Sequence, residues 1–105
     1  MADLPELDPI IHGKLRLAIL SLLSSAEAAE FVWLRDKTGA TDGNLGVQLR
    51  KLEEAGYVAC EKKFILRKPV TWYRITAQGK TALLDYVRAM KMLLNMGDTG
   101  DAGEA

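Results

Sequence analysis

The sequence predicts a mostly α-helical domain with one β-hairpin, in the order helix, helix, helix, strand, strand, helix. Three observations support this prediction. Apolar residues recur at three- and four-residue spacing in several stretches of the chain. A run of β-branched and aromatic residues, VTWYRI, follows directly after Pro69. At 105 residues, the chain is long enough for one hydrophobic core and too short for two.

The first two helices are expected over residues 9–24 and from Phe31 to about Lys37. Asp8 can cap the first helix, and Pro9 suits a first helical turn. Gly39 is expected to stop the second helix. The apolar positions that predict the first helix are Ile11, Leu15, Ala18, Ile19, Leu22 and Leu23.

The third helix is expected over residues 42–55. Gly56 follows it and can take the left-handed conformation that ends many helices. Its inward positions are Leu45, Leu49 and Leu52, so polar and charged residues occupy the opposite side.

A hairpin is expected next, with strands over residues 57–66 and 70–75 and a turn at Arg67-Lys68-Pro69. Thr76 can cap a last helix over residues 77–96. Two helices joined by a tight connection and followed by a hairpin describe a winged helix-turn-helix. A short extra strand before the helix-turn-helix is compatible with this order.

The charge is distributed unevenly along a chain whose net charge is zero. Residues 1–10 and residues 96–105 each carry −3, so the part between them carries +6. A basic centre of this kind is compatible with a nucleic-acid partner but does not require one. We expect an acidic N-terminal arm over 1–8, one domain over 9–96, and a disordered acidic tail over 97–105.

Several classes of protein are disfavoured by the sequence. No apolar run approaches the length of about 20 residues that crosses a bilayer, and the acidic start does not resemble a signal peptide. A cytoplasmic protein without a membrane partner is therefore expected. Cys60 is the single cysteine and His12 the single histidine, which argues against a disulfide or a metal site. No catalytic motif or cofactor-binding loop is present, so we expect neither an enzyme nor a cofactor.

Three segments of the sequence resemble a known family. They are LRLAILSLL at 15–23, FVWLRDKTGATDGNLGVQLRKLEEAGYV at 31–58, and FILRKPVTWYRITAQGK at 64–80. Together they are similar to the winged-helix DNA-binding domains of MarR- and ArsR-like regulators. The resemblance implies a transcriptional regulator that binds DNA as a dimer, with the last helix in the dimer contact. The metal sites of ArsR-like sensors need several Cys or His ligands, which this chain lacks.

The third helix is the expected reader of DNA bases. In helix-turn-helix proteins the N-terminal part of this helix enters the major groove. Asn and Gln side chains can each form two hydrogen bonds with adenine, and a small apolar side chain can touch a thymine methyl. The alternative is an ordinary solvated helix face. The residues expected at DNA are Thr41, Asp42, Gly43, Asn44, Val47, Gln48, Arg50 and Lys51.

The hairpin is the expected second contact with DNA. Its basic residues can reach phosphates or the minor groove. The alternative is a charged edge that discourages aggregation between strands. The residues expected at DNA are Lys62, Lys63, Arg67, Lys68 and Thr71.

The last helix is apolar over more than one side, and a surface of that width must be covered. A symmetric dimer would cover it, whereas the alternative is that the helix folds back on its own core. The residues expected at the dimer interface are Ile10, Ile11, Leu83, Tyr86, Val87, Met90, Leu93 and Leu94.

The function predicted from these residues is a homodimeric regulator that binds double-stranded DNA. The alternative is a winged helix that binds an acidic protein and has no sequence-specific contact with DNA. The sequence leaves open whether a small-molecule effector, a partner protein or the expression level controls the activity.

Overall fold

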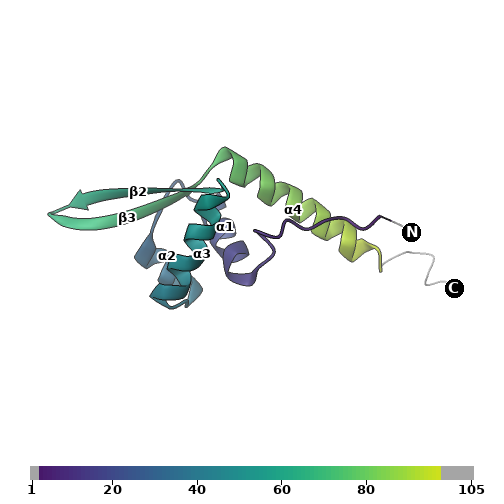
Figure 1. Ribbon diagram of the computed structural model, residues 1–105, viewed down its shortest axis with the longest axis horizontal. Helices are drawn as coiled ribbons and strands as arrows, with labels where there is room; N and C mark the ends of the chain where they lie inside the picture. Colours follow the sequence, from purple (N-terminus) through teal and green to yellow (C-terminus); the bar gives the residue numbers. More distant parts are fainter. Residues whose placement is uncertain (1–2, 98–105) are drawn as a thin grey trace.

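The computed structural model describes residues 3–97. Four helices and a small sheet follow one another in the predicted order, with one short strand added (Figure 1). The elements are α1 (Lys14–Ser24), β1 (Ala29–Glu30), α2 (Phe31–Thr38), α3 (Asp42–Glu54), β2 (Val58–Ile65), β3 (Lys68–Ile75) and α4 (Ala77–Asn95). The winged helix-turn-helix prediction is confirmed. The predicted tail at 97–105 lies outside the described residues except for Gly97.

The sheet has three antiparallel strands in the order β1-β3-β2. β2 and β3 pair along their whole length, from Val58 opposite Ile75 to Ile65 opposite Lys68. β1 adds two pairs to the other edge of β3, with Ala29 opposite Tyr73 and Glu30 opposite Trp72. β1 is the short extra strand that the sequence allowed. We refer to the hairpin over residues 58–75 as the wing.

The core lies where the three short helices meet the base of the wing. The inward leucines of α3 are buried as predicted, and α4 contributes its buried Tyr86. Because the buried residues come from all four helices and the sheet, the wing and α3 have a fixed relation to each other. The buried apolar residues are Ile11, Ile19, Leu20, Leu23, Ala29, Leu34, Leu45, Leu49, Leu52, Val58, Ile75 and Tyr86.

The start of α1 differs from the prediction. The helix begins at Lys14 rather than at residue 9, with Gly13 in extended conformation at its N-cap. Asp8 closes a separate turn, in which its carboxylate accepts a hydrogen bond from the Ile10 amide at 2.8 Å. Its carbonyl also accepts hydrogen bonds from the amides of Ile11 and His12. Asp8 and Pro9 therefore form a turn that resembles a helix start in sequence.

The tip of the wing also differs from the prediction. The turn consists of Leu66 and Arg67, whereas Lys68 and Pro69 belong to β3. Both turn residues have positive φ angles, 52° for Leu66 and 67° for Arg67. Two left-handed residues in a two-residue hairpin loop match the twist of the flanking strands. Pro69 misled the prediction because it suggested a turn, although it also fits a strand at a point where one edge is unpaired, and β1 pairs only with Trp72 and Tyr73 of β3.

Thr76 caps α4 as predicted, because its hydroxyl accepts a hydrogen bond from the Gly79 amide at 2.9 Å. Gly79 is buried, and a Cβ atom there would lie 2.2 Å from the carbonyl oxygen of Tyr57. The first turn of α4 therefore packs against the start of β2 at a distance that only glycine permits.

The molecule is elongated, with extents of 67 × 24 × 22 Å. Its radius of gyration is 17.1 Å, compared with about 13 Å for a compact chain of this length. The wing projects from one side of the body and the C-terminal part of α4 from the other (Figure 1). Within residues 3–97, no helix is long and apolar enough to cross a membrane.

Candidate nucleic-acid interface

The entry to α3 is tightly organised. Thr41 is its N-cap, and the Thr41 hydroxyl accepts a hydrogen bond from the Asn44 amide at 3.1 Å. Asp42, in the first turn, forms an ion pair with Arg35 of α2 at 3.1 Å. Hydrogen bonding to Asp42 raises the pKa of Arg35, and the charge of Asp42 adds to the effect. Because Arg35 partners this carboxylate, the repulsion that Asp42 would exert on a nearby phosphate is reduced.

The outward side of α3 carries a short chain of polar contacts. Gln48 donates from Nε2 to Oδ1 of Asn44 at 3.1 Å. Oε1 of Gln48 accepts a hydrogen bond from Nη1 of Arg16 in α1 at 2.5 Å. Val47, which lies between Asn44 and Gln48 in the sequence, is 45% exposed. Asn44 and Gln48 are thus held in one arrangement by a residue from another helix, with an apolar side chain beside them.

Two glycines of α3 have open space around them. A Cβ atom at Gly43 or at Gly46 would meet no atom within 4 Å. Gly43 is exposed, whereas Gly46 is half-buried. Packing inside the protein therefore does not require either glycine.

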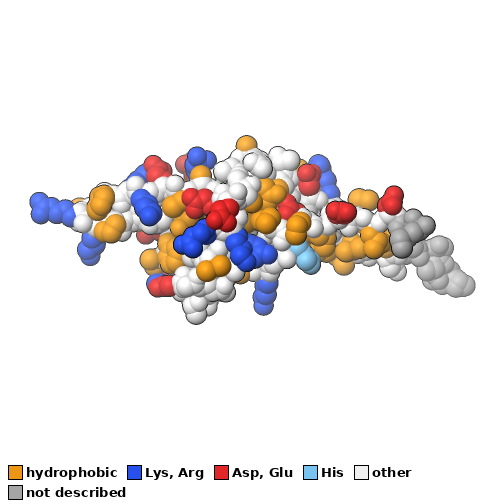
Figure 2. Space-filling model, viewed as in Figure 1, with side chains coloured by type: hydrophobic (Ala, Val, Ile, Leu, Met, Phe, Trp, Pro, Cys, Tyr) orange, Lys and Arg blue, Asp and Glu red, His pale blue; other side chains and the backbone are white. Residues whose placement is uncertain are grey.

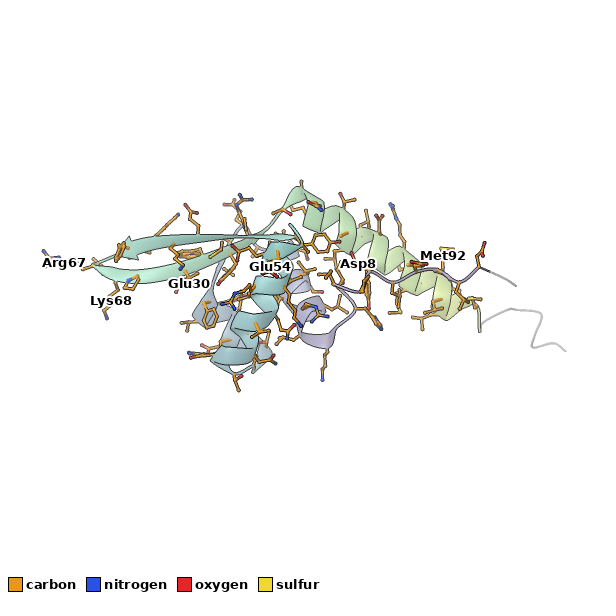
Figure 3. The ribbon with its side chains drawn as sticks, in the orientation of Figure 1. Asp8, Glu30, Glu54, Arg67, Lys68 and Met92 are labelled. Carbon is orange, nitrogen blue, oxygen red and sulfur yellow. The ribbon has the colours of Figure 1, made fainter. Side chains whose placement is uncertain are left out.

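The cations expected near phosphates lie on the surface. Arg50 and Lys51 of α3 are exposed, as are Lys62 and Lys63 of the wing. Lys63 forms an ion pair with Glu61 at 3.7 Å. Arg67 and Lys68 extend from the end of the wing (Figure 3). Thr71, farther back on β3, is half-buried.

In the part of the chain that the structure describes, three cations in the outer part of the wing, residues 62–71, form no ion pair with Asp or Glu. They are Lys62, Arg67 and Lys68. Figure 2 shows the basic side chains at the far end of the wing. This end of the molecule can meet a polyanion without first breaking an internal ion pair.

The residues predicted at the dimer interface divide into two groups. Ile11 is 0% exposed and Tyr86 is 5% exposed, so a single copy of the chain already covers both. Both belong to the core of a single copy of the chain. Val87 is 39% exposed and Leu94 is 67% exposed. The remaining ones, Ile10, Leu83, Met90 and Leu93, are half-buried.

Sequence reasoning missed other apolar residues of α4 that lie open. Leu84 is 49% exposed and Met92 is 61% exposed. Met92 lies on the part of α4 that projects beyond the body (Figure 3). The signal was present in the sequence, because these residues flank the inward stripe of the helix at helical spacing.

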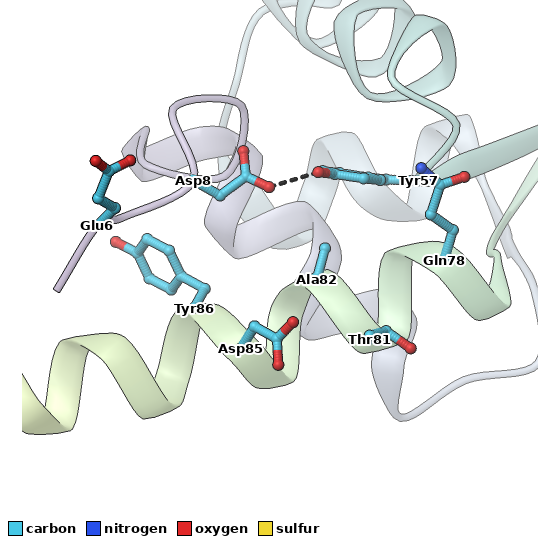
Figure 4. Close-up of a pocket in the computed structure, with 8 residues that line it drawn as sticks. All are labelled: Glu6, Asp8, Tyr57, Gln78, Thr81, Ala82, Asp85 and Tyr86. Carbon is cyan, nitrogen blue, oxygen red and sulfur yellow. Dashed lines mark hydrogen bonds between the residues drawn. The ribbon is translucent and has the colours of Figure 1, made fainter.

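A cleft of about 450 Å³ lies between the N-terminal segment and α4 (Figure 4). At its edge the Tyr57 hydroxyl donates to Oδ2 of Asp8 at 2.5 Å. This hydrogen bond is the main cause that raises the pKa of Tyr57 to about 12, and burial adds to it. Tyr73, on β3 and outside the cleft, also has a raised pKa of about 12. Burial is the main cause, and the neighbouring Cys60 adds to it. The residues that line the cleft are Glu6, Asp8, Tyr57, Gln78, Thr81, Ala82, Asp85 and Tyr86.

Side-chain contacts beside the cleft attach the N-terminal segment to the rest of the fold. His12, at the end of this segment, lies 2.9 Å from the Tyr86 hydroxyl through Nδ1. Within residues 3–97, no group of three or more His, Cys, Asp or Glu side chains could hold a metal ion. The contact between His12 and Tyr86 joins the segment to α4.

Comparison with known proteins identifies similar chains. A family described as winged helix DNA-binding domain matches residues 15–94. An uncharacterized protein of Methanocaldococcus jannaschii is 40% identical over 78 residues, which cover 74% of this chain and 85% of that protein.

Two solved structures are also similar. A transcriptional regulator homologue from Pyrococcus horikoshii OT3 is 28% identical with a TM-score of 0.79, over 86% of this chain and 89% of that one. A MarR-family regulator from Enterococcus faecalis V583 is 25% identical with a TM-score of 0.66, over 90% of this chain and 82% of that one.

Proposed function

This chain belongs to the winged helix DNA-binding domain family, and from that premise we propose that it is a transcriptional regulator that binds duplex DNA as a homodimer. α3 enters the major groove, and the wing meets the backbone or the minor groove. The observation that carries the proposal is the pairing of an exposed polar face on α3 with unpaired cations on the wing. No catalytic role is part of it.

Contact with the major groove is assigned to the N-terminal half of α3. Asn44 and Gln48 supply amide groups, and the exposed Val47 supplies an apolar contact for a thymine methyl. Arg50 and Lys51 are exposed and can neutralise phosphates. Thr41 and Gly43 lie at the helix start, where helix amides favour a nearby phosphate.

Contact with the backbone or minor groove is assigned to the wing. Lys62, Arg67 and Lys68 are exposed and have no acidic partner among residues 3–97. Each phosphate that they neutralise releases condensed cations from DNA, which favours binding at low salt. Lys63 and Thr71 complete the set that we assign to this contact.

The homodimer is assigned to the projecting part of α4. Val87, Met92 and Leu94 are exposed there, although large apolar side chains normally avoid water when they are grouped. A second copy would cover them and would present a second α3 to a palindromic site. We therefore propose that residues 9–96 form the DNA-binding and dimerisation domain, with residues 1–8 as an arm.

The test is fluorescence anisotropy of a labelled mixed-sequence duplex over a series of salt concentrations. The wild-type protein is expected to bind with a steep salt dependence. The double variant Arg67→Glu/Lys68→Glu is expected to bind more weakly, and its slope should flatten by about one for each phosphate that the wing no longer neutralises.

A matched control reverses the same number of charges elsewhere. Arg88→Glu/Lys91→Glu changes two exposed cations of α4, far from the wing. It should leave the slope unchanged if the wing is the contact. Absence of salt-dependent binding by the wild-type protein would reject the proposal and favour an acidic protein as the partner.

A further inference from the structure

The far end of the wing combines apolar and basic side chains. We define the wing tip as residues 64–69. Leu66 is 91% exposed, Phe64 is 79% exposed and Ile65 is 45% exposed. No other exposed large apolar residue among residues 3–97 reaches the exposure of Leu66 or Phe64. Leu66 and Phe64 are therefore left largely in water and add little to the core of the fold.

The register of the hairpin groups these residues. Phe64 lies opposite Pro69 across the strands, so the two share one face of the wing. Leu66 follows at the turn itself, beyond the last strand pair between Ile65 and Lys68. The apolar residues are therefore few and grouped at the turn end of the hairpin. The hairpin itself projects from the body (Figure 1).

The turn residues are unusual for their backbone conformation. Leu66 and Arg67 both have left-handed φ angles, whereas turns of this kind favour Asn-Gly or other small residues. A leucine with positive φ costs free energy relative to asparagine or glycine. A strained residue that is also fully exposed points to a contact outside the chain.

The surroundings of the tip are complementary to a polyanion. Lys62, Arg67 and Lys68 flank the apolar residues and form no ion pair within residues 3–97. A lipid surface and a second copy of the chain are the other occupants that an apolar tip could have. The free cations and the family of this chain favour DNA over both.

We propose that Leu66, supported by Phe64, is an apolar wedge that inserts between base pairs from the minor groove and bends the duplex. This inference rests on the proposed function, because it requires that the wing meets DNA. Apolar side chains inserted in this way unstack a base step and kink the duplex toward the major groove. Arg67 and Lys68 hold the phosphates on both sides while Leu66 enters the stack.

The wedge gives the wing a basis for choosing among sequences. Pyrimidine–purine steps such as TA and CA unstack easily, whereas A-tracts are stiff. The wing would therefore favour sites that place a flexible step beneath it, without a hydrogen bond to any base. This selectivity adds to the contacts of α3.

The experiment uses a duplex of about 20 base pairs, roughly 68 Å long, that the wild-type protein selects from a random library, with a fluorescent donor and acceptor at its two ends. Energy transfer at saturating protein reports the bend, and anisotropy reports the affinity. Leu66→Asn removes the apolar side chain and keeps the turn, because asparagine tolerates the left-handed conformation. Leu4→Asn is the matched control, since Leu4 is also exposed, at 63%, but is remote from the wing.

Wild-type protein is expected to bend the duplex by about 20–90°. Leu66→Asn should lose most of this bend, with affinity reduced by less than about tenfold and the salt slope unchanged, because no charge is altered. Leu66→Phe should retain the bend.

Equal bending by Leu66→Asn and wild type, or binding without any bend, overturns the wedge and leaves the proposed function standing. Failure of the wild-type protein to select or bind DNA overturns both. A shift in sedimentation coefficient caused by Leu66→Asn in the absence of DNA would assign the tip to contact between copies, and this also overturns the wedge.

Discussion

Nη1 of Arg16 in α1 lies 2.5 Å from Oε1 of Gln48 in α3, and Gln48 in turn donates to Asn44. Each amide oxygen therefore already accepts one hydrogen bond within the protein, which leaves one lone pair on each. Contact with adenine through one amide needs a free acceptor as well as a donor. These internal contacts engage the two oxygens more than the N–H groups, which favours the acceptors of guanine over the mixed donor and acceptor of adenine.

Replacement of Arg16 with methionine should change the choice of base rather than abolish binding. It frees Oε1 of Gln48, so sites selected from a random library should shift toward adenine at the position that Gln48 meets. Lys14→Met removes a neighbouring exposed cation and is the control. Identical base preferences for Arg16→Met and wild type would show that Arg16 does not set the readout.

The same substitution should lower the free energy of unfolding. Nε of Arg16 also donates to the carbonyl of Ile10 at 2.5 Å, so the substitution removes a second hydrogen bond. Hydrogen bonds of a charged group contribute about 1.5–3 kcal/mol each when buried, and less at this half-buried position. Urea denaturation of both variants separates this loss of stability from the change in base preference.

Gly46→Ala should stabilise the protein without weakening DNA binding. A Cβ atom there meets nothing within 4 Å, and alanine is favoured over glycine within a helix by about 1 kcal/mol. Thermal unfolding should show an increase in Tm of roughly 4–8 °C. A decrease in Tm would contradict the open space that surrounds Gly46.

Gly43→Ala is the informative companion to that variant. Gly43 also has open space around it, yet it is exposed at the start of α3, on the side that we assign to DNA. We expect Gly43→Ala to keep or raise the stability and to weaken duplex binding, because a methyl group would separate the helix backbone from DNA. Unchanged anisotropy curves would exclude a close approach at Gly43.

Tyr57 makes the stability of the folded protein depend on pH in the alkaline range. Its pKa is raised to about 12 by the hydrogen bond to Asp8 and by burial, compared with about 10 in an unfolded chain. The folded state therefore holds the phenolic proton more tightly. The contribution to stability is complete below pH 10 and disappears as the pH rises from about 10 to about 12.

Tyr57→Phe should remove this component and cost about 1 kcal/mol at neutral pH, because one hydrogen bond is no longer formed. Titration followed by tyrosinate absorbance should then lose one of the groups that ionise near pH 12. Asp8→Asn is the control, because Tyr57 remains but its pKa should fall toward the ordinary value. A Tyr57 titration that Asp8→Asn leaves unchanged would contradict the assigned cause.

The order of the elements could be predicted because each element carries its own local signal. The inward leucines of α3 have helical spacing, and Gly56 ends that helix with a φ of 84°. Thr76 could be identified as a cap from its position alone. These signals act over a few residues, so the sequence is sufficient to read them.

The predictions from the sequence differ from the structure where tertiary contacts determine the local conformation. Asp8 reads as a helix cap, but its carboxylate is shared between the Ile10 amide and the distant Tyr57 hydroxyl. Ile11 has the character of an interface residue, yet the body of the domain buries it completely. The sequence places Leu66 in a strand, because no periodic signal distinguishes a strand end from a turn when the turn lacks Gly or Asn.

The hydrogen bond between Arg16 and Gln48 is a feature of the candidate site that the sequence could not predict. The residues of α3 that face outward followed from helical spacing, but the partner that orients them lies on α1, 32 positions away in sequence. The same holds for Arg35 and Asp42, which meet across two helices. Pairings of this kind depend on how the helices pack against one another. The spacing of residues within one helix gives no information about that packing.

Leu94→Glu should convert the protein to a monomer. Leu94 is 67% exposed on the projecting part of α4, so a charge there should destabilise the isolated monomer little. In a dimer formed through this surface, the same charge would be buried without a partner. Sedimentation equilibrium measures the mass, and affinity for a palindromic duplex should fall because two α3 helices no longer bind together. Leu66→Glu, at a still more exposed leucine on the wing, is the matched control and should remain dimeric. A dimer of Leu94→Glu with unchanged dissociation constant would place the contact between copies on another surface.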